Sequence, residues 1–478
     1  MHRFSPASTL RRVAFLLVFG IVACSDEPPV GPGDDDEDPL PADVRSAVVI
    51  DTAGSVFRSI EIELDSAAQL EVFYQPVGGG RVFRIASEGA AAFHELPLPR
   101  LRQATDYAYA VRTRNDDAVS DSIYRGTFST DSLPAELLGF EYAVTGASTF
   151  GMLMVPIRDP SGWAGQIAIE SDGAIVWFME SVGGTLVAAP VPGTHDMIFI
   201  ENGFPNDGGR NGIVRVSPDR EVVALLERNE DQFGRIHHDL TAVDEERVYF
   251  LAYDTMTVRD TVINGEAVWE WNMTTGAVTK RWSSWDFFDW DADRGETSNP
   301  AGWFHANSIS IGPRGNIVIS SRALSQVFSI SADFDSIEWR VGGPNATHAL
   351  SEADRFRGQH SAWELPGGRV LLFDNHNVSN EPWHFSRALE LQLGQDSAWS
   401  VFEYTSDPPL KSSLRGGVYR VPSGNTVVIY ASIPFWAHEV TPAGEVVWTL
   451  TGDMSFTNAF RATPWPSIAG ETEAAAMP

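Results

Sequence analysis

The sequence predicts an all-β protein in which an N-terminal β-sandwich precedes a six-bladed β-propeller. Three observations support this fold class. In residues 44–131, short runs such as Ser59–Leu64 alternate apolar and polar residues, a period of two that is typical of strands packed on one face. From residue 135 onward, a turn followed by a strand recurs roughly every 50–60 residues, which is the spacing of propeller blades. Long helical periodicity is absent.

Length and charge limit the possible functions. The chain has 478 residues, 43% of them hydrophobic, which suits two or three domains with sizeable cores. Its 34 basic and 64 acidic residues give a net charge of −30. Such a surface repels phosphate backbones, so nucleic-acid binding is not expected. Lys280 and Lys411 are the only lysines and no GxxxxGK[ST] string occurs, which excludes a Walker-type phosphate loop.

Residues 1–23 have the features of an export signal. Arginines precede an apolar run, Val13–Val22, that is too short to span a membrane as a stable helix. The run continues into the string IVAC, ending at Cys24, which resembles a bacterial lipobox, and the following Ser25 favours the outer membrane. We expect an exported protein anchored there by lipid on Cys24, facing the periplasm or the cell surface. A secretory signal with an incidental cysteine is the alternative. Because Cys24 is the only cysteine, no disulfide is expected within the mature chain.

The next segments are predicted to be a tether and a domain. Residues 24–43 combine Pro, Gly and a run of acids, which is typical of a solvated linker. Residues 44–131 are predicted to form the β-sandwich. The string LRQATDYAYAV at 101–111, followed by GTFST, resembles the last strands of a fibronectin type III domain, and this resemblance implies that Tyr107 is the tyrosine corner.

Two recurring elements define the propeller, residues 135–465. One is a turn followed by a strand, as in GPRGNIVI at 312–319; the other is a strand that ends in tryptophan, as in GEVVW at 444–448. Turns and strands of this kind do not fit within helices. The spacing gives six blades, with seven as the alternative. Residues 466–478 are expected to be a C-terminal tail.

Histidines precede the turn motif in three successive repeats. His238 and His360 each lie five residues before an apolar turn residue. Asn307 takes the same position in its blade, His305 lies two residues earlier on the same face, and Arg322 ends the following strand. Because equivalent positions converge on the propeller channel, we expect these five side chains to share one pocket. Their chemistry suits an anionic oxyacid group rather than a carbohydrate, for which paired carboxylates are expected.

Two other interpretations of the histidines are open. A single histidine before a turn is usually structural, but three in matching register with Asn307 and Arg322 favour a site. Histidines from three blades could ligate a metal, but no His-x-His or HExxH spacing supports this, so no metal is expected. Of the adjacent His237 and His238, the register favours His238.

The strings around these residues resemble those of the bacterial arylsulfate sulfotransferase family. In order, they are HHD, FHANS, SSR, GQHxxxxLPGG followed by LLFDN, and PxGEVVW followed by FRA. Order and spacing match over about residues 135–465, and an N-terminal β-sandwich is a family trait. Family members are exported six-bladed propellers that move a sulfuryl group from a phenolic sulfate ester to a phenol without a nucleotide donor. The resemblance therefore implies a phenolic sulfate donor and a phenol acceptor as partners, and no cofactor.

Carried over by position, the resemblance also implies roles. His360 would be the nucleophile that forms a sulfohistidine. Arg322 and Asn307 would hold the sulfuryl oxygens, and His238 or His305 would exchange a proton with the two phenols, giving ping-pong kinetics. Trp303, beside His305, is a candidate for an aromatic-binding mouth.

One departure and two alternatives remain. Some relatives carry a disulfide near the site, which this chain cannot form. The loops around the site can therefore differ in conformation from those of such relatives. The alternatives are a non-catalytic propeller that binds a ligand or protein at the cell surface, and an aryl sulfatase that uses water as the acceptor at the same residues.

Overall fold

A computed structural model describes residues 42–51, 56–115, 119–158, 162–181, 183–202, 211–229, 231–376, 385–431, 434–453 and 459–478. These residues belong to one compact unit, Pro41–Pro478. Cys24 and nearly all of the tether lie outside the described residues, so the export signal and lipidation stay predictions. Among the described residues, no helix combines the length and hydropathy that crossing a membrane requires.

The first strands form two groups joined by one long strand. They are β1 (Val44–Ile50), β2 (Arg58–Pro76), β3 (Val82–Ala86), β4 (Ala91–Leu98), β5 (Asp106–Arg114) and β6 (Tyr124–Ser129). The first half of β2 pairs with β1 and β4, and its second half pairs with β3 and β5. As the alternating pattern predicts, Ile60 and Ile62 are fully buried while Glu63 is exposed.

Both strand groups contribute to one hydrophobic core, which contains Ile60, Val72 and Tyr107. The Tyr107 hydroxyl accepts a hydrogen bond from the Arg102 backbone N–H at 2.8 Å, the contact that a tyrosine corner requires. The core and this contact agree with a sandwich arrangement, and the likeness to fibronectin type III domains stays a prediction. The expected C-terminal tail contains a further strand, β33 (Thr472–Ala474), which pairs with β3.

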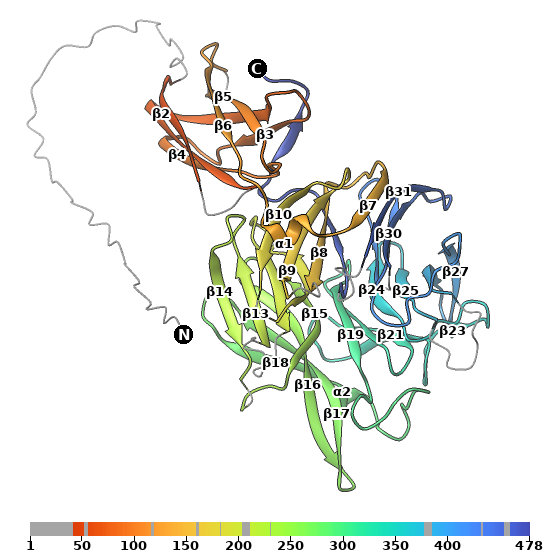
Figure 1. The fold of residues 1–478 in the computed structure, drawn as a ribbon. Helices are drawn as coiled ribbons and strands as arrows, with labels where there is room; N and C mark the ends of the chain where they lie inside the picture. Colours follow the sequence, from red (N-terminus) through yellow and green to blue (C-terminus); the bar gives the residue numbers. More distant parts are fainter. Residues whose placement is uncertain are drawn as a thin grey trace, which may run out of the picture. The chain divides into compact units, whose positions relative to one another are not determined.

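Six blade sheets built mainly of antiparallel strands follow, confirming the six-bladed prediction (Figure 1). The first three blades are the following: β8 (Met152–Arg158), β9 (Ala164–Glu170), β10 (Ile175–Glu180) with β32 (Thr463–Trp465); β11 (Thr185–Pro190), β12 (Met197–Asn202), β13 (Asn211–Val216), β14 (Val222–Glu227); and β15 (Ile236–Ala242), β16 (Arg247–Val258), β17 (Thr261–Asn272), β18 (Val278–Ser283).

The last three blades complete the propeller. They are the following: β19 (Ala306–Ile311), β20 (Ile317–Ser321), β21 (Gln326–Ile330), β22 (Ile337–Val341); β24 (His360–Leu365), β25 (Arg369–Asp374), β26 (Arg387–Leu393), β27 (Ser397–Tyr404) with β23 (Ala349–Leu350); and β28 (Gly417–Arg420), β29 (Thr426–Tyr430), β30 (Phe435–Val440), β31 (Val446–Gly452) with β7 (Tyr142–Gly146). Only α1 (Ala135–Leu138) and α2 (Ser284–Phe287) are helical among the described residues.

The repeats occupy the places that the sequence predicts. The tryptophans that end the repeat strands pack between blades, and Trp177 and Trp448 are each 1% exposed. Turn glycines such as Gly315 and Gly424 have φ of 79° and 89°, a conformation that a β-carbon disfavours. Blade packing and turn chemistry therefore explain why these residue types recur.

Strands from both ends of the propeller segment close the ring. β7 pairs with β31 in the sixth blade, and β32 pairs with β8 in the first. The inner strands β11, β15, β19, β24 and β28 contact one another in succession, and Figure 1 shows β15, β19 and β24 near the middle of the propeller. Residues at the beginning of these strands are thereby brought together.

Candidate functional site

The inner strands of three successive blades are irregular where the predicted site residues lie. The pairing register shifts between Ile236 and Leu240 in β15, between Ala306 and Ser308 in β19, and between His360 and Trp363 in β24. His238 and His305, with φ of 58° and 52°, adopt the left-handed conformation that non-glycine residues rarely take. Bulges and strained residues of this kind redirect side chains and are frequent next to active sites.

A cavity of about 460 Å³ lies at these bulges. Its walls come from several blades and include four of the predicted residues, His238, His305, Arg322 and His360. The described residues that line it contain no Asp or Glu. They are Arg158, Gly183, Gly184, Thr185, Leu186, Arg235, His237, His238, Tyr253, His305, Arg322, His360, Leu414, Arg415 and Phe460. Four arginines without a carboxylate in the wall favour an anionic ligand.

The imidazole rings lie next to one another. The ring centroids of His238 and His305 are 4.9 Å apart, and the Phe460 ring lies 5.6 Å from His238 and 6.1 Å from His360. His238, His305 and His360, which are distant in sequence, thus lie in one cavity as the sequence predicts. Within the part of the chain that the structure describes, no three ligand-type side chains are grouped as a metal site would need.

The hydrogen bonds of His360 set its tautomer. The Asn375 amide nitrogen donates to the backbone oxygens of Ser412 and Arg415, so its Oδ1 is the atom that faces His360 Nδ1, at 2.7 Å. An amide oxygen only accepts, so Nδ1 carries the hydrogen and the lone pair is left on Nε2. The Arg415 backbone N–H donates a hydrogen bond to this Nε2 at 3.3 Å, which agrees with a lone pair on that atom. Burial lowers the pKa of His360 to about 3, so the imidazole is neutral near pH 7.

Replacing Asn375 by Asp tests this orientation. A carboxylate would raise the pKa of His360 by stabilising the imidazolium, and it could not donate to Ser412 and Arg415. We expect kcat/KM to fall about 10–100-fold at neutral pH and to recover as the pH rises, because only an unprotonated imidazole can act as a nucleophile. In the wild type, protonation of His360 should not reduce activity above about pH 4, given its pKa of about 3.

The matched control for this variant is Asn272→Asp. Asn272 Oδ1 accepts hydrogen bonds from the backbone of Thr274 and Thr275 in a hairpin turn, and a carboxylate accepts them equally well. A pH profile of Asn375→Asp that superimposes on those of the wild type and this control would disprove the tautomer assignment.

Arg322 and His305 form the wall from the fourth blade. The Arg322 backbone N–H donates to the His305 backbone oxygen at 3.0 Å. In the described part of the chain, no carboxylate pairs with the Arg322 guanidinium, and its buried Nε has no partner. Burial lowers the pKa of Arg322, and burial with the Arg322 charge lowers the pKa of His305 to about 4. A guanidinium held without a counter-charge beside a cavity is suited to an anion.

Both adjacent histidines take part in the site. His237 and His238 both line the cavity, and their Nδ1 atoms are 2.7 Å apart. His237 Nε2 lies 2.8 Å from Glu266 Oε2, with both side chains buried. The register in the sequence favours His238 alone, whereas the structure places both histidines in the cavity wall and in contact with each other.

Asn307 lies beneath the cavity rather than in its wall. It is fully buried, and its amide nitrogen donates to the Gln359 backbone oxygen at 2.7 Å. Its backbone oxygen accepts from Arg461, whose guanidinium also pairs with Asp239 at 2.9 Å. Asn307 thus ties the blade of His305 to that of His360, which differs from the expected contact with sulfuryl oxygens.

Trp303 does not form an aromatic mouth. It is fully buried, and its ring packs against Trp285 with centroids 4.5 Å apart. The prediction from its position near His305 is wrong because the indole is buried in the hydrophobic core shared by the third and fourth blades. The aromatic side chains that line the cavity are Tyr253 and Phe460.

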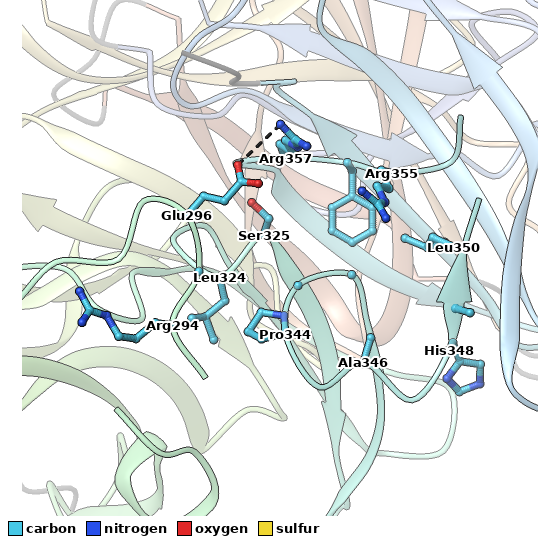
Figure 2. A pocket seen from close by; sticks show the side chains of 15 residues that line it. Arg294, Glu296, Leu324, Ser325, Pro344, Ala346, His348, Leu350, Arg355 and Arg357 are labelled. Carbon is cyan, nitrogen blue, oxygen red and sulfur yellow. Dashed lines mark ion pairs between the residues drawn. The ribbon is translucent and has the colours of Figure 1, made fainter. Parts of the chain in front are cut away.

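A second cavity of about 510 Å³ differs in its electrostatics. It contains His348 and none of the predicted residues, and Figure 2 shows its side chains. Its Arg357 pairs with Glu296 at 3.6 Å, and Arg355 pairs with Glu352 at 3.0 Å. Arg355 and Arg357 are thus neutralised locally, whereas Arg322 of the histidine cavity has no carboxylate partner among the described residues.

Several residues of the site had no predicted role. Asp239, Asn375, Phe460 and Arg461 all lie within strings that stand out in the sequence, namely HHD, LLFDN and FRA. Glu266 lies in the blade string GEAVW, which predicts a core strand and gives no sign of a buried carboxylate beside histidine.

Comparison with known proteins gave one family match. Residues 235–453 match the family model of arylsulfotransferases (ASST), a segment that contains all five predicted site residues. No curated protein sequence matched the chain.

Two solved structures that are similar to the chain have low identity and TM-scores below 0.5. One is a protein of unknown function from Bacteroides caccae, 13% identical, which covers 66% of this chain and 100% of that chain with a TM-score of 0.43. Another is virginiamycin B lyase from Staphylococcus aureus, 12% identical, which covers 83% of this chain and 99% of that chain with a TM-score of 0.32.

Proposed function

We propose that this protein transfers a sulfuryl group from a phenolic sulfate ester to a phenol, with His360 as the nucleophile. The observation that carries the proposal is the His360 Nε2 lone pair, fixed by Asn375 in a cavity whose described wall has four arginines and no acid. The match of residues 235–453 to the arylsulfotransferase family supports the same reaction class.

The first half-reaction begins with Nε2 of His360 attacking the sulfur atom. The N–S bond forms as the bond from sulfur to the phenolic oxygen breaks, and the phenolate leaves. By analogy with phosphoryl transfer, the transition state is loose, so the protein's main task is to hold the sulfuryl oxygens and stabilise the leaving oxygen. Arg322 binds the sulfuryl oxygens, and a ring N–H of His238 gives its proton to the phenolate.

The second half-reaction reverses these steps with another phenol. His238 takes the phenolic proton, the phenolic oxygen attacks sulfur, and the N–S bond breaks. His360 returns to its neutral form, so donor and acceptor react in turn at one cavity. Leu186 and Phe460 in the wall provide apolar contact for the aromatic rings.

A chromogenic aryl sulfate tests the proposal. The purified protein is given 4-nitrophenyl sulfate with and without phenol, and both 4-nitrophenolate and phenyl sulfate are measured. We expect phenol to accelerate 4-nitrophenolate release, with one phenyl sulfate formed for each 4-nitrophenolate.

The other outcomes would identify the alternatives. Release at the same rate without phenol, together with free sulfate, would indicate an aryl sulfatase. Absence of release with any aryl sulfate, with saturable binding of the donor, would indicate a ligand-binding propeller.

A further inference from the structure

We propose that Glu266, His237 and His238 form a proton relay in which His237 carries the positive charge while His238 exchanges the proton with the phenols. This inference rests on the proposed function and assigns a part to two residues for which the sequence predicted none.

The three groups are in contact one after another, the first contact being an ion pair, and both histidines line the cavity. Glu266 lies on β17, and the two histidines are neighbours on β15. Glu266 Oε2 is 2.8 Å from His237 Nε2, and His237 Nδ1 is 2.7 Å from His238 Nδ1. The His237 and Glu266 side chains are 5% and 1% exposed, so water does not substitute for either contact. His238 Nε2 is the nitrogen that remains for the cavity.

His238 alone does not hold an extra proton near pH 7. Burial lowers its pKa well below the ordinary value, and the nearby His237, His305, His360 and Arg461 lower it further. A positive charge on this ring is therefore strongly disfavoured near pH 7. A neutral imidazole nevertheless donates from Nε2 if Nδ1 receives a proton at the same time.

The relay supplies that second proton. Before transfer, His237 holds hydrogens on both nitrogens beside the Glu266 carboxylate, and His238 holds one on Nε2. As the phenolate leaves, the Nε2 hydrogen moves to its oxygen and the hydrogen on His237 Nδ1 moves to His238 Nδ1. One proton leaves the relay, His237 becomes neutral, and His238 Nε2 is bare. The acceptor phenol returns the proton by the reverse path.

The surroundings hold the relay in place. Glu266 Oε1 accepts a hydrogen bond from the Ala306 backbone N–H at 3.1 Å. Tyr253 pairs with Glu266 across β16 and β17, and its ring lies 4.2 Å from the His237 ring. Burial raises the pKa of Glu266 and the nearby Asp254 adds to this, while His237 opposes both. His237, Asp254 and Tyr253 are thus the titratable groups on neighbouring elements whose charges act on or respond to Glu266.

Donors with different leaving groups separate a relay from a structural role. A 4-nitrophenolate leaves without protonation, whereas an unsubstituted phenolate needs the acid. We expect Glu266→Gln to lower single-turnover cleavage of phenyl sulfate about 100-fold or more and to change cleavage of 4-nitrophenyl sulfate less than about 10-fold. His237→Asn, which still contacts His238 but takes no proton, should behave in the same way.

Glu439→Gln is the matched control. Glu439 is a fully buried carboxylate on β30 that accepts a hydrogen bond from Asn425 at 2.7 Å, outside the cavity. It should change both donors equally or not at all. Thermal melting of each variant checks folding, and His237→Asn decides the question if Glu266→Gln does not fold.

The outcomes distinguish the two proposals. Equal losses on both donors in the relay variants, or no loss, would overturn the relay while leaving sulfuryl transfer intact. A wild-type protein that cleaves neither donor would overturn the proposed function, and the relay with it.

Discussion

Replacing His360 with Ala is expected to lower kcat/KM for sulfuryl transfer by about 10³-fold or more. The variant lacks the atom that bonds to sulfur, and no other imidazole takes its place. His305 belongs to a different blade, and His238 is engaged with His237 at Nδ1. The wild type mixed with donor alone should release one phenol per protein in a rapid first phase, and the variant should release none.

The covalent intermediate gives a second measurement. In the wild type treated with donor alone, intact mass should rise by one SO₃ group, and this group should map to the peptide that contains His360. His348→Ala is the matched control, because it removes a histidine from the second cavity (Figure 2). Full first-phase release by His360→Ala would refute the assignment of the nucleophile.

Replacing Arg322 with Met is expected to lower kcat/KM by about 10²–10³-fold. The methionine keeps much of the side chain's volume but removes the charge beside His305. Because the guanidinium is half-buried without a carboxylate partner in the described chain, its positive charge is available to the sulfuryl oxygens. Arg322→Lys should recover part of the activity, since an ammonium keeps the charge but loses the bidentate geometry.

A control variant and a comparison of kcat with KM test the prediction for Arg322. Arg355→Met, which removes an exposed arginine paired with Glu352 in the second cavity, should leave kcat/KM within about twofold. The Met and Lys variants of Arg322 should differ mainly in kcat if the contact strengthens in the transition state. An Arg322→Met variant as active as Arg355→Met would show that another arginine of the cavity binds the anion.

The sequence predicts the propeller and much of its site because both rest on repetition. Each blade needs a turn with glycine and a tryptophan that fills the gap to the next blade, so Gly315 and Trp448 are visible in the pattern. The same periodicity places His238 and His360 in equivalent positions. Their convergence on one cavity then follows from ring closure.

The features that were not predicted depend on single contacts between blades. Glu266 has the sequence context of an ordinary blade strand, and only the three-dimensional structure shows that its carboxylate meets His237. Asn307 satisfies the register, but its amide is used by Gln359 across a blade boundary. The pairing of β33 with β3 joins segments almost 400 residues apart, and its short strand has no distinctive pattern.

The position of Arg461 in the chain has a consequence for biosynthesis. Its guanidinium holds Asp239 at the third blade and the Asn307 backbone at the fourth, yet it follows every strand of the six blades except β32. A ribosome makes this residue after all of the histidines. A nascent chain that has not reached Phe460 and Arg461 contains His360, but it lacks the Arg461 contacts to Asp239 and Asn307 and the strand β32 that completes the first blade. The cavity therefore becomes complete in a single late step of synthesis, when β32 pairs with β8 and closes the propeller ring.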